Sequence, residues 1–104
     1  MTVNILALME KKKRKIIVTG GSGYLGSHVR RYFGADDFSR RTGMDIRNPA
    51  DARSIADYDV VIHMAALVDK RPEAASSVFA VNVGGTINLL ENLRRDQVLI
   101  YCST

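Results

Sequence analysis

The sequence predicts an α/β protein with a doubly wound parallel sheet of about four strands in the order 3-2-1-4. Three observations predict this fold class. Short apolar runs rich in β-branched residues recur along the chain, and helical patterns separate them. A glycine-rich segment joins the first apolar run to the first helical pattern. Strands that alternate with helices at this spacing pair in parallel through right-handed crossovers.

The first half of the chain contains two predicted strands with a helix between them. Residues 16–18 form a β-branched run that glycines end, which is typical of a buried strand. Residues 25–33 carry apolar side chains at helical spacing, and Gly34 ends this helix. Residues 35–41 (ADDFSRR) are expected to form the second strand, although Phe38 is its one strongly apolar residue.

The second half continues the alternation. Asn48 can cap a short helix whose first position is Pro49, and residues 59–65 (DVVIHMA) form the third predicted strand. A long helix is predicted over residues 72–95 and a fourth strand over residues 97–103 (QVLIYCS). Four residues of the long helix are expected to face inward: Phe79, Val83, Leu90 and Leu93.

Composition indicates one ordinary globular domain. The chain has 104 residues, 46% of them hydrophobic and 25% charged, with a net charge of +4. Five of the 15 basic residues lie at 11–15, and without them 10 basic residues stand against 11 acidic ones. A nucleic-acid partner is therefore not expected, and we interpret residues 1–14 as a basic, disordered extension. A nucleic-acid patch or a targeting signal is the alternative for that segment.

Other features limit where the chain is expected to work. Residues 1–8 (MTVNILAL) are too few to span a membrane, and no membrane partner is expected. The single cysteine, Cys102, excludes an internal disulfide and favours a reducing compartment, so we predict a cytoplasmic protein. No metal site is predicted.

Four glycines lie in the segment VTGGSGYLG, between the first strand and the first helix, and three of them are evenly spaced. Gly20, Gly23 and Gly26 form the pattern G-x-x-G-x-x-G in a strand–turn–helix context. Bare backbone there lets a pyrophosphate approach the amide N–H groups at the helix start, where the helix dipole favours negative charge. A tight turn without a ligand is the alternative, and we favour dinucleotide binding.

Four motifs together resemble one protein family. TGGSGYLG, the pair DI at 45–46, HMAA at 63–66 and NVGGT at 82–86 are similar, in this order, to motifs of the extended short-chain dehydrogenase/reductases. That family includes the NAD(P)-dependent epimerases and dehydratases of nucleotide sugars. The resemblance implies that residues 15–104 are the N-terminal part of an NAD(P)-binding Rossmann domain, a partial and truncated sheet.

The resemblance also implies roles for particular residues. Asp45 and Ile46 would lie along the adenine, with the carboxylate accepting from the exocyclic amine, whereas the residue pattern alone leaves Asp45 open as a turn residue. Ala65 and Ala66 would let the cofactor lie close to the backbone. The pyrophosphate loop would comprise Thr19, Gly20, Gly23, Tyr24, Leu25 and Gly26.

Two further positions concern the active site. By resemblance, Asn82 helps to order it. Thr104 matches the hydroxyl residue that hydrogen-bonds the reacting oxygen of the substrate, with its neighbour Ser103 as the alternative.

The end of the second predicted strand bears on the choice of cofactor. An acidic residue there accepts from the ribose hydroxyls of NAD, whereas arginine accommodates the 2′-phosphate of NADP. Ser39, Arg40 and Arg41 occupy this place, and the forked donors of arginine match phosphate geometry. We therefore predict NADP, with NAD as the alternative.

The catalytic pair of the family, Tyr-x-x-x-Lys, does not occur in this sequence. Tyr24, Tyr32 and Tyr58 are followed four places on by His, Asp and Ile, and Tyr101 is too near the last residue. We expect no catalysis by this chain alone and interpret it as a fragment of an epimerase, dehydratase or reductase that acts on a nucleotide sugar or a related substrate. The alternative is a non-catalytic dinucleotide-binding or interaction module.

The fourth predicted strand has consequences for association. In the order 3-2-1-4 it lies at an edge of the sheet, and its apolar residues are left uncovered. We expect homo-oligomers or aggregation through this strand. The other expected partners are the dinucleotide and, in a longer form only, a small-molecule substrate.

Overall fold

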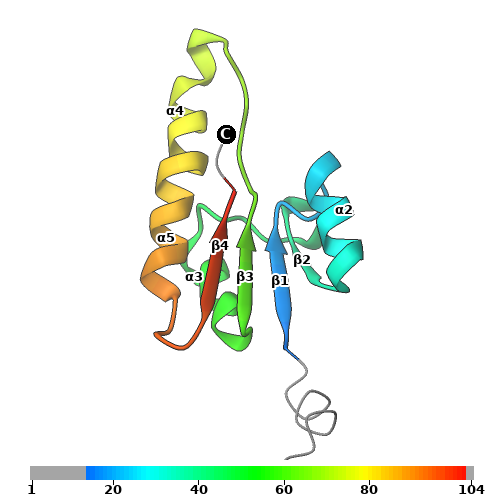
Figure 1. Cartoon of the computed structure of the whole chain (residues 1–104). Coiled ribbons are helices and arrows are strands. Elements are labelled where there is room, and N and C mark those ends of the chain that lie inside the picture. The colour runs from blue at the N-terminus through cyan, green and yellow to red at the C-terminus, as the bar shows by residue number, and fades with distance from the viewer. Residues whose placement is uncertain (1–13, 103–104) are drawn as a thin grey trace, which may run out of the picture.

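Four parallel strands form one sheet in the part of the chain that the structure describes (Figure 1). They are β1 (Ile16–Thr19), β2 (Asp36–Phe38), β3 (Val60–His63) and β4 (Val98–Tyr101). A computed structural model describes residues 14–102. The predicted α/β class with a parallel sheet is confirmed. The predictions for residues 1–13 and for Ser103 and Thr104 lie outside the described residues.

The predicted strand order, 3-2-1-4, is wrong. The strands follow one another across the sheet as β2-β1-β3-β4, so the third strand pairs with β1 and not with β2. After Phe38 the chain leaves the sheet in a 3₁₀ turn, Arg40–Thr42, which Ser39 and Thr42 close with a reciprocal capping box. Among residues 14–102 no further strand forms beside β2, and the next one pairs with the other side of β1. β4 lies at the edge of the sheet, as predicted.

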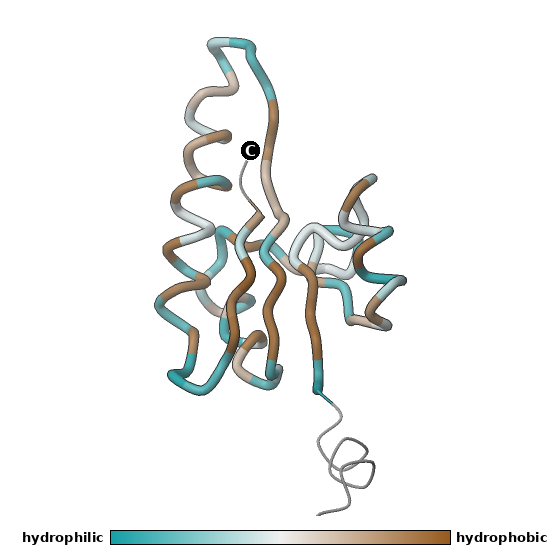
Figure 2. The backbone as a smooth tube through the Cα atoms, in the orientation of Figure 1, coloured by the Kyte–Doolittle hydropathy of each residue, from teal (hydrophilic) through white to brown (hydrophobic). Residues whose placement is uncertain are grey.

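Both faces of the sheet carry helices, because alternate strand residues are apolar on both sides. Helix α2 (Tyr24–Phe33) lies on one face, where Val29 packs against a cluster containing Val18 and Ile62. On the other face, α3 (Pro49–Ala52), the 3₁₀ turn Arg53–Asp57 and the helix before β4 enclose the larger part of the core (Figure 1). The buried residues of that core are Ile17, Phe38, Ile46, Ile55, Val61 and Leu89. Figure 2 shows the apolar residues concentrated along the strands.

Two predicted helix boundaries are confirmed. Gly34 ends α2 in the left-handed conformation, with φ of 61°, and its N–H donates to the carbonyls of Arg30 and Arg31. The side-chain oxygen of Asn48 accepts from the N–H of Ala50 at 2.9 Å, and Pro49 occupies the first helical position.

The long helix predicted over residues 72–95 is instead a series of short pieces. These are a 3₁₀ turn (Pro72–Ala74), α4 (Ala75–Phe79), a π-helical turn (Ala80–Gly84) and α5 (Gly85–Asn92).

The inward face of these pieces also differs from the prediction. Phe79, Val83 and Leu90 are exposed, whereas Leu89 is fully buried. The reason is Gly85: a Cβ at this position would come within 2.6 Å of the Ile46 side chain, so only a glycine lets the helix approach this closely. Leu89 lies one turn further on and enters the core, and of the four predicted residues Leu93 packs against it.

Residues 14–102 show neither a membrane-spanning helix nor a metal-binding cluster. None of the helices in this part of the chain is long and apolar enough to cross a membrane. The same residues contain no group of three or more His, Cys, Asp and Glu side chains placed to hold a metal ion.

Candidate functional site

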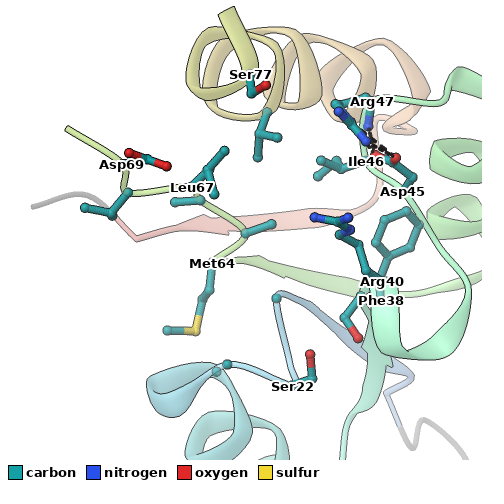
Figure 3. A pocket seen from close by; sticks show the side chains of 18 of the residues that line it. Ser22, Phe38, Arg40, Asp45, Ile46, Arg47, Met64, Leu67, Asp69 and Ser77 are labelled. Atoms are coloured by element: carbon teal, nitrogen blue, oxygen red, sulfur yellow. Dashed lines mark hydrogen bonds and ion pairs between the residues drawn. The ribbon is translucent and has the colours of Figure 1, made fainter. Parts of the chain in front are cut away.

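A cavity of about 1080 Å³ opens at the carboxyl ends of the parallel strands, the edge at which open α/β sheets bind ligands (Figure 3). Its wall comes from five places: the glycine-rich turn with the start of α2, the segment after β2, the segment after β3, the helical pieces between residues 72 and 84, and Cys102 after β4. The residues predicted for the site that line it are Gly20, Gly23, Tyr24, Leu25, Gly26, Ser39, Arg40, Asp45, Ile46, Ala65 and Ala66.

The glycine-rich turn forms one wall of the cavity. Gly20 has a left-handed backbone, with φ of 71°, and its N–H donates to the Phe38 carbonyl at 2.9 Å. Gly23 is the N-cap of α2, makes no side-chain cap and is followed by no acidic residue in the first turn. The first N–H groups of α2 therefore face the cavity without a side-chain acceptor, an arrangement that suits an anion.

Thr19 does not line the cavity, although it was predicted to bind the cofactor. It is fully buried, and its Oγ1 accepts from the N–H groups of Met64 and Ala65, both at 3.0 Å. Ala65 in turn forms part of the wall and lies against the glycine-rich turn, because a Cβ at Gly20 would come 3.0 Å from its Cα. Thr19 thus holds the end of β3 in place beneath the site.

The segment after β2 separates the three residues predicted to select the cofactor. Arg40 extends into the cavity (Figure 3), whereas Arg41 lies outside it. Ser39 is almost buried, and its hydroxyl donates to the carboxylate of Asp37 at 2.9 Å. The other oxygen of Asp37 is buried and has no hydrogen-bond partner among residues 14–102. Arg40 is therefore the residue of the three that is free to donate to a ligand.

Asp45 carries a fixed negative charge on the wall. Its carboxylate accepts from the side chain of Arg47, with a shortest distance of 2.7 Å, and from the Arg47 N–H (Figure 3). These hydrogen bonds lower the pKa of Asp45 to about 2. Asn88 of α5 holds the segment by donating to the carbonyls of Ile46 and Arg47. Asp45 is therefore ionised near neutral pH, and its orientation is set.

The segment after β3 forms the opposite wall and is held by Asn82. The Asn82 side chain accepts from the N–H of Leu67 at 2.8 Å and donates to its carbonyl at 3.0 Å, without lining the cavity itself. Further along, Arg71 pairs with Asp69 at 2.7 Å and lowers the pKa of that carboxyl. Asn82 lies in the π-helical turn, so this irregular turn anchors the wall of the cavity.

The sequence of nearly the whole chain matches the model of one protein family. Residues 16–104 match the model of the NAD dependent epimerase/dehydratase family. The chain belongs to this family. It spans about a third of the length of the curated relatives it matches.

Particular members of the family are similar to this chain in sequence or in fold. GDP-6-deoxy-D-talose 4-dehydrogenase of Aggregatibacter actinomycetemcomitans is 32% identical in an alignment 88 residues long, which covers 76% of this chain and 30% of that protein. The structure of ADP-L-glycero-D-manno-heptose-6-epimerase of Helicobacter pylori superposes with a TM-score of 0.69 and 26% identity, covering 88% of this chain and 39% of that one. UDP-glucose-4-epimerase of Stenotrophomonas maltophila, with bound NAD and formylated UDP-arabinopyranose, gives a TM-score of 0.67 and 25% identity, over 88% and 37% of the two chains.

The cavity of this epimerase/dehydratase family member also contains charged residues that the motifs did not indicate. Arg47, Asp69 and Arg71 line it, and the sequence holds a signal for all three. Asp-x-Arg occurs twice shortly before a proline, as DIRNP at 45–49 and DKRP at 69–72. In both copies the arginine folds back on the aspartate. The predicted catalytic residue Thr104 lies beyond the described residues, and Cys102 at the end of β4 is the last described residue of the wall.

Proposed function

We propose that residues 15–104 are the NAD(P)-binding part of an NAD(P)-dependent epimerase, dehydratase or reductase that acts on a nucleotide sugar or a related hydroxyl or carbonyl substrate. The observation that carries the proposal is which groups line the cavity together. The cavity is lined by the start of α2, which has no side-chain cap and follows the closely fitted glycines of the turn. It is also lined by Asp45, whose carboxylate is ionised and held in one orientation. A dinucleotide needs both, because its diphosphate is an anion and its adenine amine is a donor.

In this arrangement each wall has a separate task. The N–H groups at the start of α2 bind the diphosphate. Asp45 accepts from the adenine amine at the one site that Arg47 leaves available: a carboxylate has about four acceptor sites, and the backbone N–H, Nε and Nη2 of Arg47 supply three donors. The backbone at Ala65 and Ala66 provides a flat surface for the rest of the cofactor. When bound, the nicotinamide supplies hydride transfer.

Arg40 supports NADP as the preferred cofactor. It extends into the cavity, and no carboxylate within residues 14–102 lies at ion-pair distance from it. Arg41 lies outside the cavity, and the Ser39 hydroxyl already donates to Asp37. The preference for a 2′-phosphate therefore rests on Arg40 alone among the three predicted residues.

Titration of the 104-residue chain with NADPH and NADH tests this proposal. We expect the chain to bind NADPH more tightly than NADH. Arg40→Ala is expected to lower the affinity for NADPH about tenfold and to leave the affinity for NADH unchanged, because a solvent-exposed charge-assisted hydrogen bond contributes about 1.5 kcal/mol. Arg41→Ala is the matched control, because it removes the same charge one residue further on, outside the cavity. A clear preference for NADH, or an equal loss for both coenzymes, contradicts the assignment of Arg40.

A non-catalytic dinucleotide-binding module is the second candidate. It requires only the cavity lined by the glycine-rich turn and Asp45, and no proton-transfer group held within hydrogen-bond reach of a reacting atom. The coding sequence after Thr104 discriminates between the two candidates. An in-frame Tyr-x-x-x-Lys favours the enzyme, and a stop codon favours the module.

A further inference from the structure

A buried histidine connects two of the segments that form the cavity. His63 is the last residue of β3 and is 2% exposed. Its Nδ1 lies 2.6 Å from the hydroxyl of Thr19 in β1, and its Nε2 lies 2.9 Å from the hydroxyl of Thr86 in α5. The Thr86 hydroxyl donates in turn to the carbonyl of Asn82, at 2.7 Å.

The hydrogen bonds of the two threonines determine where the imidazole proton lies. Oγ1 of Thr19 accepts from two backbone N–H groups, those of Met64 and Ala65, so its own proton is left to donate to Nδ1 of His63. Nδ1 therefore carries no proton, and the single proton of the neutral ring is on Nε2, where it is donated to Thr86. The Met64 N–H is shared between Oγ1 and the carbonyl of Thr19, and each of the side-chain donors in this network has one acceptor.

We propose that His63, as the neutral ring with its proton on Nε2, is a positioning residue for the dinucleotide. It joins Thr19, which holds the backbone of Met64 and Ala65, to the helical turn whose Asn82 holds Leu67. This inference rests on the proposed function. The segment from Met64 to Leu67 is the wall that lies against Gly20, where a Cβ would come 3.0 Å from the Ala65 backbone. A shift of this wall therefore changes the space left for the cofactor.

The surroundings of His63 favour the neutral ring. The groups that face it are Thr19 from β1, Thr86 from α5 and, with a ring centroid 5.4 Å away, Tyr101 from β4. Tyr101 is the one titratable group of these three, and none of them is an anion that would stabilise a protonated ring. Burial accordingly lowers the pKa of His63. A protonated ring would also place a second proton between Nδ1 and Thr19, which has no free lone pair to accept it.

The first experiment determines the tautomer of His63 and needs no cofactor. The ¹⁵N resonances of the His63 imidazole in the 104-residue chain at pH 7 are expected to show a bare Nδ1 and a protonated Nε2. The substitution Thr86→Val keeps the volume of the side chain and removes the hydroxyl that accepts from Nε2. In this variant we expect the Nε2 proton to exchange faster with water, or the tautomer with its proton on Nδ1 to become detectable. Thr86→Ser restores the hydroxyl and is expected to restore the wild-type resonances. A protonated Nδ1 in the wild-type chain overturns the proposal.

The second measurement is NADPH affinity in the same three proteins. Thr86→Val loses one neutral hydrogen bond beneath the site and is expected to bind NADPH about tenfold more weakly than the wild type. The affinity of Thr86→Ser for NADPH is expected to lie within about twofold of the wild-type affinity. Far-UV circular dichroism at the temperature of the titration checks that each variant is folded. If the wild type binds and Thr86→Val binds equally well, this inference is overturned and the proposed function stands. If the wild type binds neither NADPH nor NADH, the proposed function fails, and the inference with it.

Discussion

The substitution Gly26→Ala tests whether the third glycine of the turn is required by close packing. Gly26 lies in the first turn of α2, and a Cβ added there would overlap the carbonyl oxygen of Gly20 and come within 2.9 Å of its carbonyl carbon. Both contacts are with backbone, so no change of side-chain rotamer relieves them. The strand–turn connection and the helix must instead move apart.

The magnitude follows from two opposing effects. Alanine is favoured over glycine by about 1 kcal/mol inside a helix. Overpacking against a rigid neighbour costs about 1–3 kcal/mol or more, and overlap with a backbone oxygen places this site at the upper end. We therefore expect a net loss of about 2 kcal/mol in the free energy of unfolding. For a domain of this size each kcal/mol corresponds to about 4–8 °C in the melting temperature.

The control is Gly84→Ala, and the assays are thermal denaturation followed by circular dichroism and NADPH titration. Gly84 is also helical, but a Cβ there would meet nothing within 4 Å, so this variant is expected to be as stable as the wild type or more so by up to about 1 kcal/mol. Gly26→Ala is expected to be less stable and to bind NADPH more weakly, since the N–H groups at the helix start are displaced. Two variants of equal stability and affinity would refute the close-packing argument.

Two further predictions concern charge and the edge of the sheet. The folded-state pKa of Asp45, about 2, is below its ordinary value of 3.8, so its pairing with Arg47 stabilises the fold above pH 4 and this contribution is lost as the pH falls toward 2. In urea denaturation series at pH 7, 4 and 2, Arg47→Ala should lose less stability between pH 4 and pH 2 than the wild type; equal losses would count against the pairing. On β4, the side chains of Val98 and Ile100 are 46% and 47% exposed, so Ile100→Lys is expected to reduce self-association in sedimentation velocity experiments relative to the wild type. A wild-type chain that is already a stable monomer would contradict the predicted association through this strand.

Local signals predicted much of the fold and part of the site. The glycine turn, the Asn48 cap and the end of α2 at Gly34 depend on residues within a few positions of one another, and all three form as predicted. The site residues on the turn and after β3 line the cavity for the same reason, since each follows directly from the end of a strand.

The incorrect predictions have two sources, an unrecognised 3₁₀ turn after Phe38 and a contact between residues far apart in the sequence. The strand order depends on the turn after Phe38, which leaves the outer side of β2 without a partner strand among the described residues. The inward face of the long helix depends on the contact between Gly85 and Ile46, which apolar periodicity does not reveal. The separation of Arg40 from Arg41 depends on the same 3₁₀ turn, because successive residues of a turn point in different directions.

The sequence by itself determined the parallel α/β class and the place of the glycine turn between β1 and α2, because these depend on apolar periodicity and on backbone conformations that neighbouring residues impose. Only the tertiary structure decided which strand lies beside β1, and which protonation state His63 requires. Both depend on where hydrogen-bonding groups from separate segments meet: Thr19 and His63 are 44 residues apart in the chain, and their side chains come within 2.6 Å only once β1 and β3 are paired.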